Sequence, residues 1–485
     1  MSQNTMELCA EQEHAFNKYI NKQNIFITGP GGTGKSELIR KIYSHATLNR
    51  RNIQVCALTG CAALLLRCRA KTIHSWAGIG LGTGTTESIV KKVATNYFKC
   101  KEWRKTSILI IDEISMMSKK VFEMLDLIGK TIKKNNKPFG GIQLIFSGDF
   151  YQLPPVGDPE TTQFCFESEL WTETFPIPNH IMLTQIFRQT DPVYSSILNQ
   201  IREGKLKRSS VSILEKQVNK PMPTDANVAR PTKLYPVRNK VEQINHSEMG
   251  KLGTGSEAYT TQFVLNLAMT PAERLERATF TEDQIDAELN YLQSNLLCDS
   301  TIELKVGAQV MCVVNIETAS GAILCNGSQG IITRFNDFKL PVVRYTNGCE
   351  VVMSYHVWQS ETIPGIGVSQ IPLILAWALT IHKSQGASID CAEIDVGSSI
   401  FECGQTYVAL SRVKSLEGLY LTSFDVNKIK INRKVRDFYA HIQEQQAQLE
   451  SDKASQKRTE SPAEASLKCG SPSVEENVKV IHLQP

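Results

Sequence analysis

A glycine-rich stretch near the start of this 485-residue chain limits its fold more than any other feature. Its residues are Gly29, Pro30, Gly31, Gly32, Thr33, Gly34, Lys35 and Ser36. They match the pattern G-x-x-x-x-G-K-[ST], between a predicted strand at Asn24–Thr28 and a predicted helix at Glu37–Tyr43. Backbone N–H groups of such a loop can surround phosphate oxygens, and the helix N-terminus adds a partial positive charge. The stretch therefore predicts a phosphate-binding loop in a parallel α/β fold.

Further buried strands are predicted at Ile53–Leu58, Ser107–Ile111 and Ile142–Phe146, each ahead of a loop or helix. Polar side chains follow two of them directly. Asp112 and Glu113 come after the second, where we expect Asp112 and the hydroxyl of Ser36 to hold Mg²⁺ and Glu113 to act as the general base for the attacking water. Gln152 comes after the third, where it could sense the γ-phosphate. The pattern predicts a nucleoside triphosphatase.

The middle of the chain changes character. Residues 183–300 are more helical and polar, and four short strand-like runs follow: Gln309–Ile316, Gly330–Phe335, Pro341–Thr346 and Glu350–Trp358. Asn326-Gly327 and Asn347-Gly348 suit hairpin turns between them. We expect a small β-barrel inserted into an α/β host, which resumes at Ile371. Beyond about Glu450 there is no Phe, Trp or Tyr, so we expect a disordered tail.

Composition excludes several classes of protein. The 53 basic and 49 acidic residues give a net charge of +4, which excludes a strongly basic coat protein but not a local DNA groove. The 13 cysteines include no C-x-x-C pair, so a zinc ribbon is unsupported. The longest apolar run, around Ile371–Ile381, is too short for a membrane span. With no secretory or transit signal recognised, we expect a soluble intracellular protein, and Lys457-Arg458 favours the nucleus over the mitochondrion.

The segments around these residues resemble the petite-integration-frequency (PIF) type of superfamily 1 helicase. The resemblance rests first on Asp112–Met116, Phe122–Ile132, Lys137–Ile145 and Gly148–Pro155. The stretch between Met116 and Gly148 is similar to the signature of that family, although Lys133 or Lys134 stands where Arg is common. Other matching segments are Leu8–Gln12, Ala57–Ala63, Thr72–Trp76, Leu183–Gln189, Leu304–Met311, Leu324–Gly327, Ala378–Gly386 and Gln405–Arg412.

This resemblance covers about residues 8–425 and implies an α/β architecture of two RecA-like P-loop NTPase lobes. A small SH3-like β-barrel would be inserted in the second lobe and a small wedge in the first. The implied domains are lobe 1A at 1–182, with a 1B wedge at about 78–103, lobe 2A at 183–302 and 370–448, the 2B barrel at 303–369, and a disordered tail at 449–485. The long N-terminal extension common in that family is not expected here.

The resemblance also implies the activity and the site residues. It implies an ATP-dependent DNA helicase that acts in replication, repair or recombination, with DNA-stimulated ATP hydrolysis and 5′→3′ movement on single-stranded DNA. We expect a monomer that takes ATP and Mg²⁺ and binds single-stranded and forked DNA. Gln12 would read adenine, and Arg188 and Arg412 would reach the γ-phosphate from the second lobe. The DNA contacts expected are Thr59, Gly60, His74, Trp76, Thr380, His382, Lys383, Ser384, Gln385, Gln405, Tyr407 and Ser411.

Three other classes of protein share some of these sequence features. Asn239-Lys240-Val241-Glu242 nearly matches the guanine-reading N-K-x-D pattern of GTPases, but Glu242 is one methylene too long, and the spacing suits a surface helix at 239–247. A DNA clamp without catalysis is disfavoured because Lys35, Asp112 and Glu113 are retained together. A RecD-like or phage-type superfamily 1 relative would have the same chemistry, and only the signature favours the PIF type.

Overall fold

The structure is a computed structural model that describes residues 7–80, 84–155, 157, 162–222, 230–317, 323–360, 362–381, 383–384, 387–397 and 400–459. The chain divides into two units, residues 1–436 and residues 437–485. All the sheets described below belong to the first unit. Helix α15 (Arg433–Thr459) continues from the first unit into the second.

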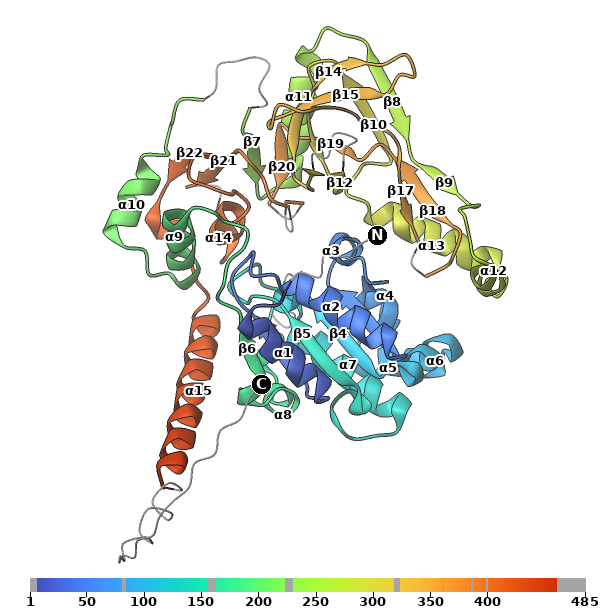
Figure 1. Cartoon of the computed structure of the whole chain (residues 1–485), viewed down its shortest axis with the longest axis vertical. Helices are drawn as coiled ribbons and strands as arrows, with labels where there is room; N and C mark the ends of the chain where they lie inside the picture. The colour runs from blue at the N-terminus through green and yellow to red at the C-terminus, as the bar shows by residue number, and fades with distance from the viewer. Residues whose placement is uncertain are drawn as a thin grey trace, which may run out of the picture. The chain divides into compact units, whose positions relative to one another are not determined.

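A six-stranded parallel sheet forms the first half of the 1–436 unit, in the order β3-β2-β4-β5-β1-β6 (Figure 1). Its strands are β1 (Ile25–Thr28), β2 (Ile53–Ala57), β3 (Lys71–Thr72), β4 (Ile108–Asp112), β5 (Gln143–Ser147) and β6 (His180–Met182). The four strands predicted from sequence are confirmed to within one residue at each end. Strands β1, β4 and β5 are buried along their whole length, as expected when helices cover both faces of a parallel sheet.

Eight α-helices accompany this sheet among the described residues. They are α1 (Ala10–Ile20), α2 (Lys35–Leu48), α3 (Gly60–Leu66), α4 (Ile73–Ala77), α5 (Thr86–Thr95), α6 (Tyr97–Lys105), α7 (Lys119–Lys133) and α8 (Leu170–Thr174). Helix α7 places Phe122, Leu125 and Ile128 on one face, three residues apart, and all three are fully buried. Short 3₁₀ turns occur at Ile114–Met116, Pro138–Gly141, Cys165–Glu167 and Ile177–Asn179, and later at Val426–Lys428.

A second parallel sheet has the order β20-β7-β21-β22. Its strands are β7 (Thr232–Tyr235), β20 (Ala378–Thr380), β21 (Ala392–Val396) and β22 (Leu419–Phe424). Its helices are α9 (Pro192–Glu203), α10 (Arg208–Glu215), α11 (Arg238–Lys251) and α14 (Gln405–Leu410). The helix expected at 239–247 lies within α11. Strands and helices from both sides of the middle segment share one apolar core, which includes Ile197, Leu234, Ile394 and Val408.

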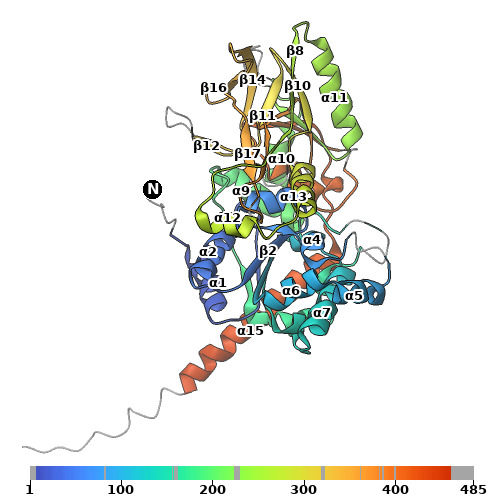
Figure 2. The same ribbon diagram turned by 90° about the vertical axis from the view of Figure 1, so that its right-hand side faces the viewer.

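Antiparallel strands occupy the middle of the sequence and lie together in Figures 1 and 2. They form sheets β16-β15-β14-β11-β19, β10-β8, β12-β13 and β17-β18-β9. The strands are β8 (Ser256–Thr260), β9 (Gln262–Val264), β10 (Thr301–Lys305), β11 (Gln309–Cys312), β12 (Ile316–Glu317), β13 (Ile323–Leu324), β14 (Gln329–Phe335), β15 (Pro341–Tyr345), β16 (Glu350–Val352), β17 (His356–Gln359), β18 (Gly367–Gln370) and β19 (Leu373–Leu375). Helices α12 (Pro271–Arg277) and α13 (Glu282–Asn295) accompany them. Two of the predicted runs, Gly330–Phe335 and Pro341–Thr346, are confirmed as the single strands β14 and β15. The other two are interrupted: Gln309–Ile316 holds β11 and the first residue of β12, and Glu350–Trp358 holds β16 and most of β17, which belong to different sheets. Gly327 and Gly348 adopt the positive φ angles (104° and 82°) that their turns require.

The C-terminal expectation differs from the structure in part. Helix α15 extends to Thr459, so residues 449–459 of the expected disordered tail are helical. Most residues of this stretch, namely Leu449, Glu450, Lys453, Ala454, Gln456, Lys457 and Arg458, are good helix formers even without aromatic residues to bury. The rest of that tail, residues 460–485, lies outside the described residues.

Candidate active site and nucleic-acid interface

The glycine-rich stretch folds as a tight loop between β1 and α2. Gly34 precedes α2 with φ 77°, a conformation that favours glycine. The Lys35 ammonium donates to the carbonyl oxygens of Gly29 (2.7 Å) and Pro30 (2.9 Å), at the mouth of the loop. The side chain of Gln12 reaches the same loop, because its Nε2 donates to the carbonyl of Thr33 (3.3 Å). The structure therefore brings Gln12 and the loop residues together.

Three side chains from the second parallel half meet this loop at Gly31. A methyl group placed on Gly31 would lie 3.6 Å from Nη1 of Arg188, 3.6 Å from Nη2 of Arg412 and 3.7 Å from the hydroxyl of Tyr407. The Gly31 N–H donates to that hydroxyl (2.8 Å). The guanidinium of Arg412 is held by the carbonyl of Val408, which accepts from its Nε (3.0 Å). Two fixed positive charges therefore face the phosphate-binding loop across the boundary between the halves.

The carboxylates Asp112 and Glu113 stand at the end of β4, facing the same region. Burial raises the pKa of Asp112. Burial also raises the pKa of Glu113 to about 7, and the negative charge of Asp112 adds to that rise. Burial also disfavours the charged form of the basic groups. It lowers the pKa of Lys35, and it lowers that of Arg412 to about 9, with a further contribution from the neighbouring charge of Arg188. Desolvated charges of both signs thus converge on one cleft, which is typical of catalytic sites.

The donor set fits a divalent cation held jointly with phosphate. Ser36 at the start of α2 offers a hydroxyl, and Asp112 offers a buried carboxylate at the end of β4. Within the described ranges, no three His, Cys, Asp or Glu side chains gather as ligands. Mg²⁺ suits such a site, because it takes one or two protein ligands and completes its shell with phosphate oxygens and water.

The loop after β5 joins the cleft to the second half. Gln152 is 6% exposed there, and a methyl group placed on Gly404, ahead of α14, would lie 2.5 Å from its carbonyl oxygen. Arg202 on α9 donates to both carboxylate oxygens of Asp149, each at 2.8 Å, and its guanidinium lies 4.5 Å from the Tyr151 ring centroid. Both charged side chains are almost completely buried. Sequence reasoning missed this ion pair, because its partners are 53 residues apart and belong to no shared pattern.

The candidate DNA residues of the first half lie near α13. The Thr59 hydroxyl caps α3 by accepting from the N–H of Ala62 (3.3 Å). A methyl group placed on Gly60 would lie 1.5 Å from Oδ1 of Asn295, so α13 is seated against the start of α3. Further along, the N–H of Thr72 donates to the Tyr291 hydroxyl (3.0 Å).

Two other candidates of the first half are not fully exposed. His74 is partly buried, and burial lowers its pKa. Trp76 is 1% exposed and packs against Trp103, with ring centroids 4.5 Å apart. In this conformation Trp76 is therefore part of the protein core and presents no face to a base.

The candidate DNA residues of the second half are mostly held by their own backbone. Lys383 is partly exposed, lies 3.6 Å from Asp299, and donates its N–H to the Thr380 hydroxyl. Ser384, Gln405 and Ser411 are buried and bonded to neighbouring backbone groups. Tyr407 lies at the phosphate-binding loop. His382 and Gln385 lie outside the described residues.

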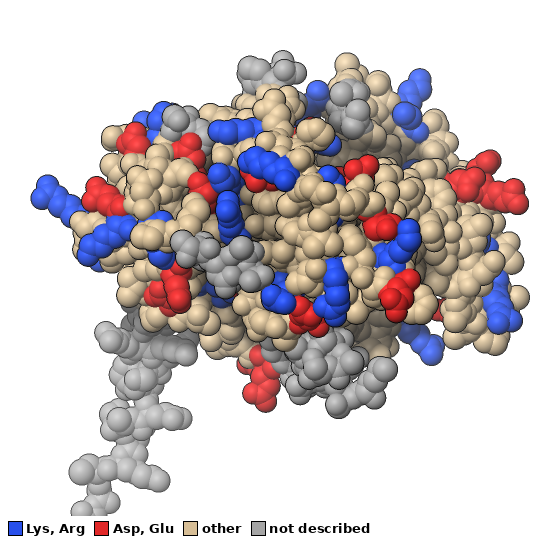
Figure 3. Space-filling view, turned by 90° about the horizontal axis from the view of Figure 1, so that it is seen from above, with Lys and Arg blue, Asp and Glu red and all other residues tan. Residues whose placement is uncertain are grey.

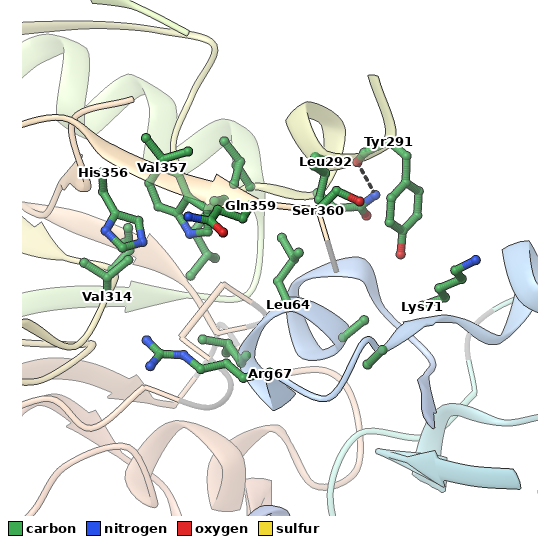
Figure 4. A pocket seen from close by; sticks show the side chains of 18 of the residues that line it. Leu64, Arg67, Lys71, Tyr291, Leu292, Val314, His356, Val357, Gln359 and Ser360 are labelled. Atoms are coloured by element: carbon green, nitrogen blue, oxygen red, sulfur yellow. Dashed lines mark hydrogen bonds between the residues drawn. The ribbon is translucent and has the colours of Figure 1, made fainter. Parts of the chain in front are cut away.

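A cavity of about 830 Å³ separates α3 from α13 and β17 (Figure 4). Arg67 and Lys71 lie on its first-half wall, and Tyr291, His356 and Gln359 lie on the opposite wall. Cationic, aromatic and amide side chains line this cavity together. Proteins bind single-stranded nucleic acid with such side chains, which contact the phosphates and stack on the bases. Sequence reasoning missed this second wall, because its residues lie outside the recognised motifs.

The fold and the cleft together define a class of protein. A phosphate-binding loop follows the first strand of one parallel sheet, and arginines from a second parallel half close over it. This is the arrangement of a two-lobed P-loop protein.

Comparison with known proteins narrows this class. Residues 7–212 match the family model of the PIF1-like helicase, and residues 289–335 match that of the 2B domain of DNA helicase Pif1. The ATP-dependent DNA helicase PIF1 of Danio rerio is 35% identical over 450 residues, which cover 92% of this chain and 65% of that protein.

Solved structures agree with these matches. The crystal structure of Pif1 helicase from Candida albicans is 33% identical, with a TM-score of 0.67 over 90% of this chain and 100% of that one. Pif1 helicase from Bacteroides in complex with ADP-AlF3 and single-stranded DNA is 28% identical, with a TM-score of 0.57 over 91% and 97%. A structure of two coordinating Pif1 helicases that unwind forked double-stranded DNA is 27% identical, with a TM-score of 0.58 over 91% and 98%.

The chain belongs to the PIF1-like helicase family. Its two parallel halves are the RecA-like lobes of that family, and it carries the 2B domain. The chain spans just under two thirds of the length of the Danio rerio relative. Within the described residues, no helix is long and apolar enough to cross a membrane.

Proposed function

We propose that this chain is an ATP-dependent DNA helicase that couples ATP hydrolysis to 5′→3′ movement on single-stranded DNA and to unwinding of forked duplexes. The observation that carries the proposal is the convergence of Arg188, Arg412 and Tyr407 on Gly31 of the phosphate-binding loop. A nucleotide bound there would touch both lobes, so its hydrolysis would alter their contact. The family relatives, including the one with ADP-AlF3 and single-stranded DNA, support the same function.

In the proposed mechanism, Lys35 and the loop N–H groups bind the β- and γ-phosphates. Mg²⁺, held by Ser36 and Asp112, would supply charge neutralisation at the phosphates. Glu113 accepts the proton of the attacking water, and its raised pKa suits this role because a base with a pKa near 7 can both hold and release a proton. Arg188 and Arg412 stabilise the charge of the transition state, and Gln152 reports loss of the γ-phosphate to the second lobe.

We assign two residues from their surroundings. Tyr407 belongs to the nucleotide site, because its hydroxyl accepts from the Gly31 N–H. Gln12 reads adenine, as the family resemblance implies, and its hydrogen bond to the Thr33 carbonyl supports this by placing it beside the loop.

The DNA track runs through the cavity of Figure 4 and over the N-terminus of α3. Thr59 and Gly60 then offer backbone N–H groups to phosphates, as helix N-termini do. Lys71 and Arg67 add positive charge, and Lys383 and Thr380 continue the track on the second lobe. His74, Ser384, Gln405 and Ser411 remain candidates, of which the buried ones need a change of conformation to reach DNA. His382 and Gln385 are proposed from the family motif alone.

The proposed domains are those that the resemblance implies, except that α15 extends into the expected tail. Lobe 1A spans 1–182 with a wedge at about 78–103, and lobe 2A spans 183–302 and 370–448. Residues 303–369 would form the SH3-like 2B barrel. The five-stranded antiparallel sheet supports the barrel, but its strand β19 (Leu373–Leu375) and the core residues Met249 and Tyr259 lie outside these limits.

The test is a pair of assays on the purified chain. ATP hydrolysis is measured with and without single-stranded DNA, and we expect a stimulation of many-fold. Unwinding is then measured on partial duplexes that carry only a 5′ or only a 3′ single-stranded tail. Equal rates of ATP hydrolysis with and without DNA would refute the proposed motor function. Unwinding only of the duplex with a 3′ tail would show that the polarity is 3′→5′ instead.

A further inference from the structure

The signature segment between β4 and β5 has no role in the proposed function so far. Its loop, Lys137 to Gly141, is built rigidly against α7. The Phe139 N–H donates to the buried Asp126 carboxylate (2.8 Å), and Phe139, Gly140 and Gly141 have φ angles of 50°, 68° and 81°. Three successive residues in the left-handed region are an unusual backbone, found where the surroundings fix the chain.

Glycine is required on both sides of this contact. A methyl group on Gly129 would lie 2.6 Å from the carbonyl carbon of Phe139, and one on Gly140 would lie 2.4 Å from the carbonyl oxygen of Gly129. The backbones of α7 and the loop therefore touch directly, and the loop presents Lys137 from a fixed position.

Lys137 lines a depression of about 480 Å³ together with Lys22 and Arg51. Arg51 is fixed there, because its Nη2 donates to Oε1 of Gln143 (2.8 Å) and its guanidinium lies 5.5 Å from the Tyr19 ring centroid. Neither lysine forms an ion pair with a described residue, and no Asp or Glu is among the described residues that line the depression. Asn24 and Ser107 add uncharged polar groups.

This depression is part of a longer basic edge of the six-stranded sheet. It lies where β1, β2, β4 and β5 begin, whereas the phosphate-binding loop and Asp112 lie where β1 and β4 end. The connections that enter these four strands, taken together with the last two residues of the helix before each, contain eight cations and no Asp or Glu. The cations are Lys22, Arg50, Arg51, Arg104, Lys105, Lys133, Lys134 and Lys137. By contrast, the face of the molecule in Figure 3 mixes Lys and Arg with Asp and Glu.

Besides Arg51, one more of the eight cations is bonded within the protein. The Lys133 ammonium donates to the carbonyls of Trp103, Arg104 and Thr106, at the end of α6. Lys22, Arg50 and Lys134 have φ angles of 58°, 53° and 52°, where Gly or Asn is the usual residue. Within two residues of its end, each of three helices of this edge is thus followed by a cation at a left-handed position, where a neutral residue would be the easier choice.

The extent of the edge indicates its ligand. Four neighbouring strands are about 14 Å across, at about 4.8 Å per strand. Over that length a DNA duplex carries about eight negative charges, at one per about 1.7 Å. A single phosphate would fill the depression alone and leave the rest of the row unmatched.

We propose that this basic edge is a second nucleic-acid-binding site, which holds the phosphodiester backbone of a duplex arm outside the single-strand track. The inference rests on the proposed function, since it assigns a further DNA contact to the same motor. It gives the signature loop a role as the wall that positions Lys137.

The experiment compares two double variants of the full chain. Lys22→Ala/Lys137→Ala removes two cations of the edge, both exposed. The matched control, Lys207→Ala/Lys216→Ala, removes two exposed cations of the second lobe. Binding to forked DNA and to a short oligothymidylate is measured by fluorescence anisotropy over a range of salt concentrations. Hydrolysis stimulated by the same oligothymidylate is measured in parallel.

We expect the edge variant to flatten the plot of log affinity against log salt for forked DNA. The slope should fall by about 1.8, because each phosphate that the protein no longer neutralises lowers it by about 0.9. Oligothymidylate binding and the stimulated hydrolysis should not change, and the control variant should keep both native slopes. An unchanged fork slope overturns the proposal, as does an equal decrease of slope with oligothymidylate or in the control.

A vesicle arm tests the class of ligand. Phosphatidylserine vesicles are offered to the native chain and to the edge variant. The proposal is wrong, and the edge is a membrane-binding surface, if three results occur together. The native chain binds the vesicles, the edge variant does not bind them, and the edge variant keeps the native fork slope. Absence of DNA-stimulated hydrolysis in the native chain would instead refute the proposed function, whatever the fork slopes show.

Discussion

The buried ion pair between Asp149 and Arg202 offers a sharp test of how the two lobes are joined. Removing the charge of Arg202 by Arg202→Met leaves the Asp149 carboxylate, whose side chain is 0% exposed, without its two charged donors. Breaking a buried pair in this way costs about 3–5 kcal/mol, because one charge stays desolvated and unpaired. Asp149→Asn should cost somewhat less, since Arg202 keeps its contact with the Tyr151 ring.

The double variant distinguishes a desolvated charge from a simple loss of packing. Asp149→Asn/Arg202→Met leaves no unpaired charge, and replacing a buried pair by uncharged groups is often close to neutral. We therefore expect the double variant to be more stable than Arg202→Met alone, with a coupling free energy of about 3 kcal/mol or more.

Urea unfolding of the four proteins measures this cycle. Tryptophan fluorescence is a suitable probe of unfolding, because Trp171, one of the five tryptophans, is 2% exposed and its ring lies 5.9 Å from that of Phe150, next to Asp149. Tyr151→Phe is the matched control, since it keeps the ring face over Arg202. The reasoning is refuted if Arg202→Met costs less than about 1 kcal/mol, or if the effects of the two single variants simply add.

Four further outcomes are expected. Lys35→Ala should abolish ATP hydrolysis and leave binding of single-stranded DNA measurable by anisotropy; loss of DNA binding in a folded Lys35→Ala protein would contradict separate sites for ATP and DNA. Chelation of Mg²⁺ should abolish hydrolysis in the native chain. Arg412→Ala should lower kcat by about 10³-fold or more while a fluorescent nucleotide still binds, and near-normal turnover would exclude Arg412 from the transition state. The hydrogen bond from the Thr72 N–H to Tyr291 holds α13 against the first lobe, and we expect DNA to open this contact when it enters the cavity. Tyr291→Phe removes this bond, worth about 1 kcal/mol, and should raise the affinity for short single-stranded DNA by about fivefold; unchanged affinity would show that DNA binds without opening the contact.

The local features of this fold could be predicted from sequence. The strand before Gly29 and the one that ends at Asp112 are continuous apolar runs, and their neighbours in the chain are helices or loops. The turns at Gly327 and Gly348 depend on one residue each. Such features are decided within a few residues, so one sequence is enough to find them.

Interactions between distant segments could not be predicted in the same way. Sequence reasoning assigned Tyr407 to DNA, whereas the structure places its hydroxyl on Gly31, 376 residues away. That placement depends on how α14 packs behind Gly404 against the loop of Gln152, a contact between lobes. The Asp149–Arg202 pair and the α13 wall of the cavity have the same origin, because each is defined by packing rather than by a motif.

The hydrogen bond from the Gly31 N–H to Tyr407 makes one amide a natural probe of the cleft. An amide exchanges its hydrogen with solvent only when its bond opens, so the exchange rate at Gly31 measures how often the two lobes separate. Deuterium uptake at this single position, followed with nucleotide, with DNA and with both, would report the opening equilibrium of the cleft without any label or substitution. The exchange rate of an amide in the proposed phosphate-binding loop would thus also report the lobe movement that ATP hydrolysis is expected to drive.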